Sequence, residues 1–466
     1  MRVLWVCNIM LPVVAEYLHK EASNKEGWLT GLSSVILERR EENGIRLAVA
    51  FPVEQKLYGW QEEILVPLGG NGEAGGRTEK LMCYGFCEDV NHAEIYDPML
   101  EVDMMRIIED FRPDVVHCFG TEYAHTLAMA KIFKFKQRLL IGIQGLCAVY
   151  ANAYMANLPE EVRASVTFRD RLKKDSLVQQ QDKFVIRGRM EKEALSLAGN
   201  ITGRTDWDRH YALEWNPSAV YHQMNETLRP EFYTGQWQEE DCEPHTIFLS
   251  QGDYPIKGLH YMLLALPAIR NRYPEVKVCV AGNSLVKGKT LMDRMKLSAY
   301  GKYLRSIIQE FHLEKHVEFL GRLDAAQMKS RYLRSGLFVC CSTIENSPNS
   351  LGEAMLLGMP CVSADVGGIP SLFSDQVDGL LYRGYRTNDN SYDNVCDEKL
   401  TEDEKRKNIV KELENAVLRI WENQEEKIEF GKNARNHAQK THDRERNYRR
   451  MMEIYSDVTS RRVDFK

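Results

Sequence analysis

The sequence predicts an α/β protein of two domains, each built on a parallel sheet with helices on its faces. Three observations support this prediction. The chain has 466 residues, too many for one ordinary hydrophobic core. Short apolar, β-rich runs alternate with segments of helical periodicity, which is typical of right-handed strand–helix–strand units. The alternation starts again near residue 244, which indicates a second domain.

The expected strands fall into two series, one on each side of this restart. The first series comprises residues 2–7 (RVLWVC), 45–51, 114–119 and 138–145. The second comprises residues 245–252, 276–282, 316–321, 337–342 and 360–365. Residues 225–245 are polar and aromatic without a helical period, so they are interpreted as the linker. We therefore expect domains at residues 1–235 and 236–439, with ligands at the carboxyl ends of the strands.

The chain beyond residue 383 combines a polar stretch with apolar helical stripes. Residues 384–408 are polar and are expected to form a surface insertion. The stripes consist of Ile409, Leu413, Val417 and Ile420, and of Tyr448, Met451, Met452 and Tyr455. We interpret them as core faces and expect the last helix, about 440–466, to pack back on the N-terminal domain.

Composition indicates an ordinary globular protein in a reducing compartment. Apolar residues make up 44% and charged residues 27% of the chain, and the net charge of −6 gives no reason to expect nucleic acid as a partner. The 11 cysteines lie in apolar segments without metal-ligand spacing, as expected of buried thiols. Asn8 and Pro12 interrupt the apolar start, so a strand is favoured over a signal peptide, and no stretch reaches the ~20 apolar residues of a membrane span. We expect a cytoplasmic protein without a cofactor.

Residues 70–75, GNGEAG, match the dinucleotide-binding pattern G-x-G-x-x-G. That pattern works by turning a strand into a helix whose amino end holds a pyrophosphate. Here a strand-like run, RTEKLMCYGF, follows instead. A strand-to-strand loop is therefore the favoured interpretation.

The stretch IENSPNSLGEAMLLGMP, residues 344–360, places Glu345 and Glu353 around a Pro-Asn-Ser turn between a strand and a short helix. The amino end of a helix carries unpaired N–H groups and partial positive charge, which suit a diphosphate. Carboxylates accept hydrogen bonds from hydroxyl pairs, so the two acids could bind a sugar and a ribose. Alternatively, Ser350 and Glu353 form a capping box, which leaves Glu345 unexplained.

The stretch from HVEFLGRL to DGLLY, residues 316–382, resembles the donor site of the family-4 retaining glycosyltransferases with the GT-B fold. The block SQGDYPIKGLHYMLLALPAI resembles the family's loop that ends in Lys-Gly. The first half is similar more loosely, through EGWLTGL and PDVVHCFGTEYAH. The resemblance implies two Rossmann-like domains that face a central cleft, with residues 1–235 on the acceptor side and residues 236–439 binding the nucleotide-sugar donor.

The resemblance also implies roles for residues of this sequence. The implied catalytic residues are Lys257, Glu345 and His117. The implied donor-binding residues are Gly31, Gly258, Arg322, Asn349, Ser350, Leu351 and Glu353. Lys257 would hold the donor diphosphate, and residues 27–31 would form a turn near it, unless they form only a plain loop before a helix.

This sequence departs from the family pattern at three positions. Gly252 stands where relatives commonly have an arginine, so a phosphate cation is missing or is supplied by Arg322 or Arg204. Phe119 and Gln144 stand where many relatives have histidines. His117 could equally be a core histidine, and Glu122 and Arg204 are expected on loops at the edge of the cleft.

The activity that the resemblance implies is transfer of a sugar from a UDP- or GDP-sugar to an acceptor hydroxyl, with retained anomeric configuration and without a metal. The leaving diphosphate can accept the proton, so the protein mainly stabilises charge on the phosphate. Three alternatives remain open: an epimerase of the same fold, a catalytically silent nucleotide-sugar-binding protein, and a phosphorylase-type enzyme, for which no pyridoxal lysine is evident.

The acceptor is expected to be a saccharide or a lipid-linked saccharide in cell-surface polysaccharide or glycolipid synthesis. Residues 131–140, KIFKFKQRLL, interleave four cations with two phenylalanines, as a surface that rests on an anionic membrane does. The same pattern also fits the end of a helix and the start of the next strand. A peripheral membrane contact is therefore one of two interpretations.

Overall fold

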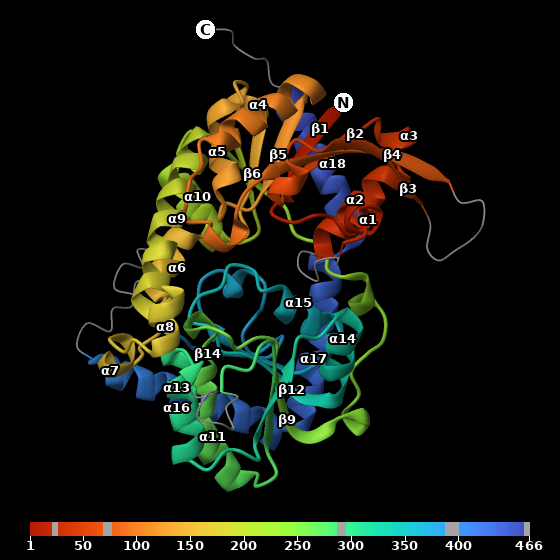
Figure 1. Cartoon of the computed structure of the whole chain (residues 1–466). Helices are drawn as coiled ribbons and strands as arrows, with labels where there is room; N and C mark the ends of the chain where they lie inside the picture. The colour runs from red at the N-terminus through yellow and green to blue at the C-terminus, as the bar shows by residue number, and fades with distance from the viewer. Residues whose placement is uncertain (21–26, 69–76, 287–294, 387–399, 461–466) are drawn as a thin grey trace. The chain divides into compact units, whose positions relative to one another are not determined.

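The computed structural model describes residues 1–20, 27–68, 77–286, 295–386 and 400–460. The chain divides into two compact units. The first unit contains residues 1–148, 184–229 and 442–466, and the second contains residues 149–183 and 230–441. Each unit is an α/β domain with its own sheet (Figure 1).

The first unit contains an eight-stranded sheet in the order β3-β4-β2-β1-β5-β6-β7-β8. Its strands are β1 (Arg2–Val6), β2 (Arg46–Val53), β3 (Gln61–Pro67), β4 (Thr78–Cys87), β5 (Val115–Phe119), β6 (Leu139–Gly142), β7 (Asn200–Gly203) and β8 (Val220–Gln223). Seven strands run parallel, and only the edge strand β3 pairs antiparallel, with β4. The loop expected at residues 70–75 lies outside the described residues.

Helices cover this sheet and connect its strands (Figure 1). They are α1 (Pro12–Tyr17), α2 (Gly27–Glu38), α3 (Arg40–Asn43), α4 (Met99–Phe111), α5 (Ala124–Ile132), α10 (Asp206–Trp215) and α18 (Arg444–Ser460). Two further helices, α6 (Cys147–Ala153) and α9 (Leu177–Leu197), contain two of the four points where the chain passes between the units.

The last helix, α18, packs into the core of the first unit, as its apolar stripe predicts. Met451 and Tyr455 are fully buried, and Tyr448 is nearly so. The Trp5 indole N–H donates to the Tyr455 hydroxyl over 2.8 Å, which ties α18 to the central strand β1. Residues 444–460 are therefore part of the first unit although they follow the whole second unit in sequence.

The second unit contains a six-stranded parallel sheet in the order β11-β10-β9-β12-β13-β14. Its strands are β9 (Glu243–Leu249), β10 (Lys277–Ala281), β11 (Val317–Gly321), β12 (Ser335–Cys340), β13 (Cys361–Asp365) and β14 (Leu380–Arg383). Its main helices are α11 (Leu259–Arg272), α13 (Ala299–Glu310), α14 (Ala325–Arg334), α15 (Asn349–Leu356), α16 (Glu402–Glu422) and α17 (Gln424–Thr441). Helices α11, α13 and α16 form one layer, while α14, α15 and α17 form the other (Figure 1).

Residues 149–183 belong to the second unit. The expected first domain, residues 1–235, included them, so this part of the predicted division is wrong. This segment includes α7 (Glu160–Arg163) and α8 (Phe168–Lys173). The buried Tyr261 hydroxyl donates to the Ala156 carbonyl over 2.8 Å. Asp170 accepts from the backbone N–H of Ala299, at the start of α13. These long-range hydrogen bonds attach the segment to α11 and α13. No local pattern in the sequence predicts them.

The segment interpreted as a linker is packed into the second unit from residue 230 onward. Phe232 is fully buried against Tyr332, with 5.7 Å between the ring centroids. The Trp237 indole donates to the Ser335 carbonyl over 2.8 Å. These aromatic residues anchor the start of the unit, so only the few residues before 230 lie outside it.

The expected strands are all present within two or three residues of their predicted bounds, and the apolar stripe of α16 is buried. Most of the expected insertion, residues 387–399, lies outside the described residues. The described cysteines are free, and most are buried. In the described part of the chain, no helix combines the length and hydropathy needed to span a bilayer.

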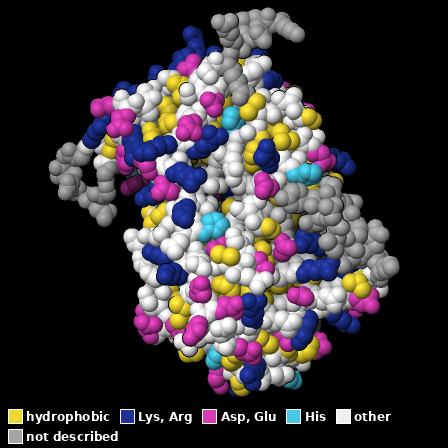
Figure 2. Space-filling model, turned by 180° about the vertical axis from the view of Figure 1, so that it is seen from behind, with side chains coloured by type: hydrophobic (Ala, Val, Ile, Leu, Met, Phe, Trp, Pro, Cys, Tyr) yellow, Lys and Arg dark blue, Asp and Glu magenta, His cyan; other side chains and the backbone are white. Residues whose placement is uncertain are grey.

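On the face shown in Figure 2, Lys and Arg side chains are interspersed with Asp and Glu side chains. Nucleic-acid-binding surfaces instead concentrate Lys and Arg in a patch or stripe. This face therefore offers no such surface.

We expect the stability of the second unit to depend on pH through His437. Its Nδ1 lies 2.6 Å from the Asp378 carboxylate, and this hydrogen bond raises the pKa of the imidazole, although burial opposes the shift. The contribution of the charged pair is therefore full below the unfolded-state pKa of about 6.5 and is lost as pH rises through the folded-state pKa. His437→Gln should cost up to about 1 kcal/mol more at pH 5.5 than at pH 8.5, since the imidazole is one-third exposed.

Denaturant unfolding of both proteins at the two pH values measures this difference. His312→Gln is the control, because His312 is exposed. An equal cost of His437→Gln at both pH values would contradict the assignment.

Candidate functional site

The loop after β9 carries Lys257 at the carboxyl end of the sheet. Residues 255–257 form a short 3-10 turn, and Gly258 then begins α11 with φ of +68°. A Cβ on Gly258 would lie 1.7 Å from the Cys341 carbonyl oxygen. Only glycine therefore permits the Lys257 loop to pack against the loop after β12. The Thr343 N–H donates to the Ile256 carbonyl over 2.7 Å and fixes the two loops together.

Glu345 and Lys257 form an ion pair where these loops meet. The Lys257 ammonium donates to Glu345 Oε1 over 2.6 Å, and the Ser342 hydroxyl donates to the same oxygen over 2.7 Å. Burial lowers the pKa of Lys257, but the Glu345 carboxylate outweighs it and holds that pKa well above its usual value. Lys257 is therefore a fixed cation that retains some exposure to solvent.

The helix α15 begins at Asn349, four residues after Glu345, as predicted. Its N-cap is Pro348, and no side chain caps it. Ser350 is the second residue of the helix and Glu353 the fifth, so the two cannot form a capping box. The capping interpretation of Glu353 is therefore wrong, and the amino end of α15 keeps N–H groups for a ligand.

Glu353 is 3% exposed in α15, and Leu351 is also buried. A carboxylate at this burial requires polar partners, so Glu353 is held in place rather than solvated. Asn349 and Ser350 are partly exposed at the first turn. The structure thus brings together Lys257, Glu345 and the start of α15, all in the second unit.

Tyr150 joins this site and was not identified from the sequence. It lies in the segment 149–183 that belongs to the second unit. Its hydroxyl accepts from the backbone N–H of Asn346 over 3.1 Å, next to Glu345. The sequence signal is weak because Tyr150 lies almost two hundred positions before its partner.

Gly252 stands where relatives commonly have an arginine, and a larger side chain at this position would displace its neighbours. A Cβ there would lie 2.8 Å from Leu259 Cδ2 and 2.9 Å from Val280 Cγ1. The described structure does not place the two arginines that were expected to substitute for the missing cation at the Lys257 site. Arg322 is exposed to solvent after β11, while Arg204 pairs with Glu226 over 2.7 Å inside the first unit. Lys257 is consequently the cation that the described structure places at the site.

We expect Gly252→Arg to destabilise the protein without tightening nucleotide binding. Overpacking of this kind typically costs about 1–3 kcal/mol. The measurement is denaturant unfolding together with calorimetric titration of a nucleoside diphosphate. Combining Gly252→Arg with Leu259→Ala should recover part of the cost of the arginine, because the alanine opens the space that Leu259 fills. Tighter nucleotide binding by stable Gly252→Arg protein would contradict this steric account.

His117 lies in the core of the first unit rather than at a site. It is fully buried in β5, with its Nδ1 2.9 Å from the Tyr455 hydroxyl and its ring against Phe119. Burial lowers the pKa of His117 to about 3, so the imidazole is neutral. With no exposed surface, it cannot touch a substrate in this conformation, and its predicted catalytic role does not fit. The alternative of a core histidine fits.

The other positions proposed in the first unit also differ from expectation. Residues 27–31 form the first turns of α2 rather than an open turn, so Gly31 lies inside a helix. Gln144 donates to the Glu226 carboxylate over 2.8 Å, which places it in the same network as Arg204. Glu122 lies just after β5, and burial raises the pKa of its carboxyl group.

The basic segment after α5 is mostly part of the fold. Phe133 is buried, and the Lys136 ammonium donates to the carbonyls of Ala130 and Lys131 at the carboxyl end of α5. Lys131, Lys134 and Phe135 are exposed, and the Lys131 ammonium pairs with Glu193 over 3.2 Å. These contacts fit a helix end, and membrane contact stays a prediction that co-sedimentation with anionic vesicles at low salt tests.

The comparisons with known proteins address this second unit first. Residues 234–416 match the family described as glycosyl transferases group 1. The chain carries a glycosyl transferases group 1 domain. The match includes the Lys257 loop, Glu345 and α15, which confirms the resemblance drawn from those residues. In the part of the chain that the structure describes, no three His, Cys, Asp or Glu side chains are grouped to hold a metal ion.

A curated relative matches part of this chain. Spore coat protein SA of Bacillus subtilis is 27% identical to this chain over 157 residues. The match covers 34% of this chain and 39% of that protein. The matches span about a third to two-fifths of the length of the curated relatives.

Solved structures match over nearly the whole chain and show the fold. Sucrose-phosphate synthase of Thermosynechococcus elongatus has a TM-score of 0.65 at 13% identity, over 99% of this chain and all of that one. HepE of Anabaena, solved with UDP and glucose, has a TM-score of 0.61 at 14% identity, over 98% and 99%. The chain therefore has the GT-B fold with two Rossmann-like units, as the sequence predicts.

Proposed function

We propose that this protein is a retaining, metal-independent hexosyltransferase that moves a sugar from a UDP- or GDP-sugar to an acceptor hydroxyl. The observation that carries the proposal is the Lys257–Glu345 ion pair beside the uncapped amino end of α15. An ammonium and free helix N–H groups favour an anion at this place. The group 1 match over the same residues, and the structure of HepE with UDP and glucose, support a nucleotide sugar as that anion.

The residues of the site have distinct roles in this proposal. Lys257 and the N–H groups of Asn349 and Ser350 stabilise the charge that grows on the leaving diphosphate. The Leu351 N–H already donates to the Pro348 carbonyl over 3.0 Å, so Leu351 contributes to the helix turn rather than to this contact. The diphosphate takes the proton of the acceptor hydroxyl on the face where the new bond forms, so configuration is retained. Glu353 accepts the ribose hydroxyls, and Glu345 faces the transferred sugar. The enzyme would act in the cytoplasm in cell-surface polysaccharide or glycolipid synthesis.

A thermal-shift panel of UDP, GDP, ADP and their sugars tests the donor. Binding to the folded state stabilises it by mass action, by about 2.7 kcal/mol at a hundred times the dissociation constant. We expect one nucleoside diphosphate to raise the melting temperature most. No shift with any of them would contradict the proposed donor site.

Product analysis then separates the proposed transferase from its alternatives. Transfer to an added acceptor, with the anomeric configuration of the product read by NMR, supports the proposal. A changed donor sugar in the absence of acceptor would indicate an epimerase. A nucleotide sugar that binds without any turnover would indicate a silent binding protein, an alternative that the missing cation at Gly252 favours.

A further inference from the structure

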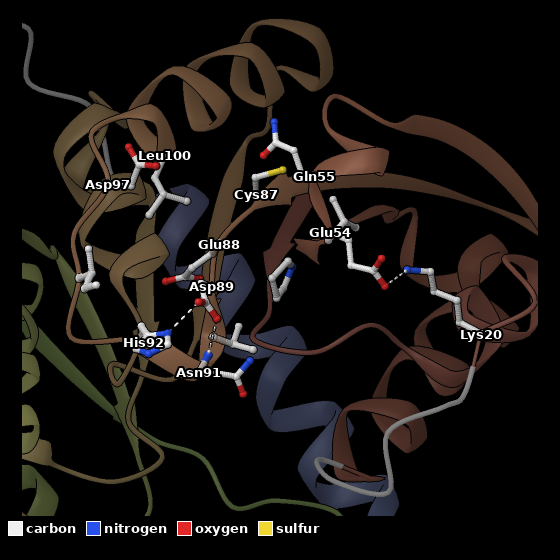
Figure 3. Close-up of a pocket in the computed structure, with 14 residues that line it drawn as sticks. Lys20, Glu54, Gln55, Cys87, Glu88, Asp89, Asn91, His92, Asp97 and Leu100 are labelled. Carbon is white, nitrogen blue, oxygen red and sulfur yellow. Dashed lines mark hydrogen bonds and ion pairs between the residues drawn. The ribbon is translucent and has the colours of Figure 1, made fainter. Parts of the chain in front are cut away.

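The first unit contains a cavity of about 680 Å³ at the carboxyl ends of β2 and β4 (Figure 3). Its lining includes residues that directly follow these strands, such as Glu54 after β2 and Glu88 after β4. Open parallel sheets bind ligands outside the carboxyl ends of their strands. The volume is also within the usual range of about 300–1,000 Å³ for small-molecule sites.

The polar lining of this cavity is dominated by carboxylates. Four of them, from Glu54, Glu88, Asp89 and Asp97, face one ammonium, that of Lys20. In Figure 3, Lys20 and Glu54 point toward one another, and the structure joins them over 3.1 Å. The lining thus carries net negative charge even when this pair is discounted.

Hydrogen bonds fix two of the carboxylates in place. Glu88 accepts from the backbone N–H of Ala124 and from His125 Nδ1, the latter over 2.5 Å, and its side chain is almost fully buried. Asp89 accepts from the backbone N–H of Asn91 and lies 2.8 Å from His92 Nδ1 (Figure 3). The acceptor oxygens at this edge of the cavity are therefore positioned before a ligand arrives.

The remaining lining combines amides with apolar surface. The side-chain amides of Gln55 and Asn91 can both donate and accept hydrogen bonds. Ile95 and Val90 are partly exposed and offer apolar surface beside them. A sugar ring presents hydroxyl groups at its edge and C–H groups on its face, so this combination suits a saccharide. A phosphate or carboxylate would meet like charge.

We propose that this cavity binds the acceptor, and that the acceptor moiety is a hydroxyl-rich saccharide without anionic groups. The proposal rests on the proposed glycosyltransferase function and names its acceptor class. The chemistry is opposite to that of the Lys257 site in the second unit, where a cation and a helix amino end favour an anion. Each unit would thus recognise one of the two substrates by its charge.

Ligand-observed NMR on the full chain with three probes tests the charge preference. The probes are methyl glucoside, methyl glucosaminide and methyl glucuronide, which are neutral, cationic and anionic. We expect the neutral and cationic probes to bind at low salt at least about tenfold more tightly than the anionic one, because several carboxylates act on it together. Equal or tighter binding of the glucuronide would overturn the proposal.

Two variants connect binding to this cavity. Asp89→Asn with Asp97→Asn removes two charges and should reduce the discrimination against the glucuronide several-fold. Glu109→Gln is the control for lost charge, since Glu109 is exposed on α4 and does not line the cavity, and it should leave the discrimination unchanged. Asn91→Trp should abolish binding of the neutral probe by filling the cavity from an exposed position.

Nucleotide binding, measured on the same samples, separates this proposal from the proposed function. Unchanged affinity for UDP or GDP in Asn91→Trp, with lost probe binding and lost transfer, supports an acceptor role. Probe binding and transfer that survive in Asn91→Trp would overturn the acceptor site and leave the donor site intact. If no nucleotide binds the wild type, the glycosyltransferase proposal fails, whatever the probes do.

Discussion

Replacing Lys257 with glutamine is expected to weaken binding of the nucleoside diphosphate by about ten- to a hundredfold. Lys257 is the cation that the structure places at the meeting point of the loops after β9 and β12. Loss of a charge-assisted contact typically costs about 1.5–3 kcal/mol, which corresponds to that range of dissociation constants. Glutamine retains a donor for Glu345, so the variant loses the charge without leaving the carboxylate unbonded.

Turnover of Lys257→Gln should fall further than its nucleotide affinity. Negative charge grows on the diphosphate as the sugar leaves, so a cation at this position stabilises the transition state more than the bound donor. Calorimetric titration and the rate of nucleotide release measure the two effects. Lys277→Gln is the matched control, because Lys277 is exposed at the amino end of β10, away from the strand ends that carry the site. Nucleotide binding as tight as that of the wild type in Lys257→Gln would contradict its assignment to the diphosphate.

The sheets were predictable because their strands are short apolar runs with a clear break on each side. The runs at 2–7 and 360–365, for example, become β1 and β13 with little change in their bounds. In contrast, β7 and β8 are only four residues long and were missed, since such short runs do not stand out from loops. The strand-like character of the run after residue 76 was recognised, and it forms β4.

The residues that meet in the second unit could be selected from the sequence, because their motifs lie in compact blocks. The contact between Lys257 and Glu345 connects two of these blocks across 88 positions. The resemblance implied both residues for the donor site, but it did not imply this ion pair. The first unit was less predictable. In the sequence, His117 lies near the end of a strand, where a site residue is also expected. The structure shows that its side chain is buried against Tyr455, which comes from the last helix of the chain. The division at residues 149–183 depends on hydrogen bonds such as that from Tyr261 to Ala156, for which no sequence pattern exists.

The two glutamates of the site are expected to respond differently to neutralisation. If Glu353 binds ribose hydroxyls, it contacts a part of the donor that does not change during reaction. Glu353→Gln should then weaken the nucleoside diphosphate and the transition state alike, by roughly tenfold. The capping explanation predicts no change, but α15 has no side-chain cap and Glu353 lies in its second turn, so that explanation does not apply.

Glu345→Gln should instead lower turnover strongly while leaving affinity for the nucleoside diphosphate unchanged or slightly higher. A nucleoside diphosphate has no sugar to contact Glu345, so its affinity should not depend on that residue. In addition, neutralising Glu345 weakens its 2.6 Å ion pair with Lys257 and leaves the ammonium more available to the diphosphate. Ser342→Ala is the control, since it removes only the neutral hydrogen bond to Glu345 and should lower turnover less. Calorimetric titration of each variant beside its turnover rate distinguishes the roles. Equal loss of nucleotide affinity in both glutamine variants would remove the division between sugar and ribose, and no effect in either would remove the donor site.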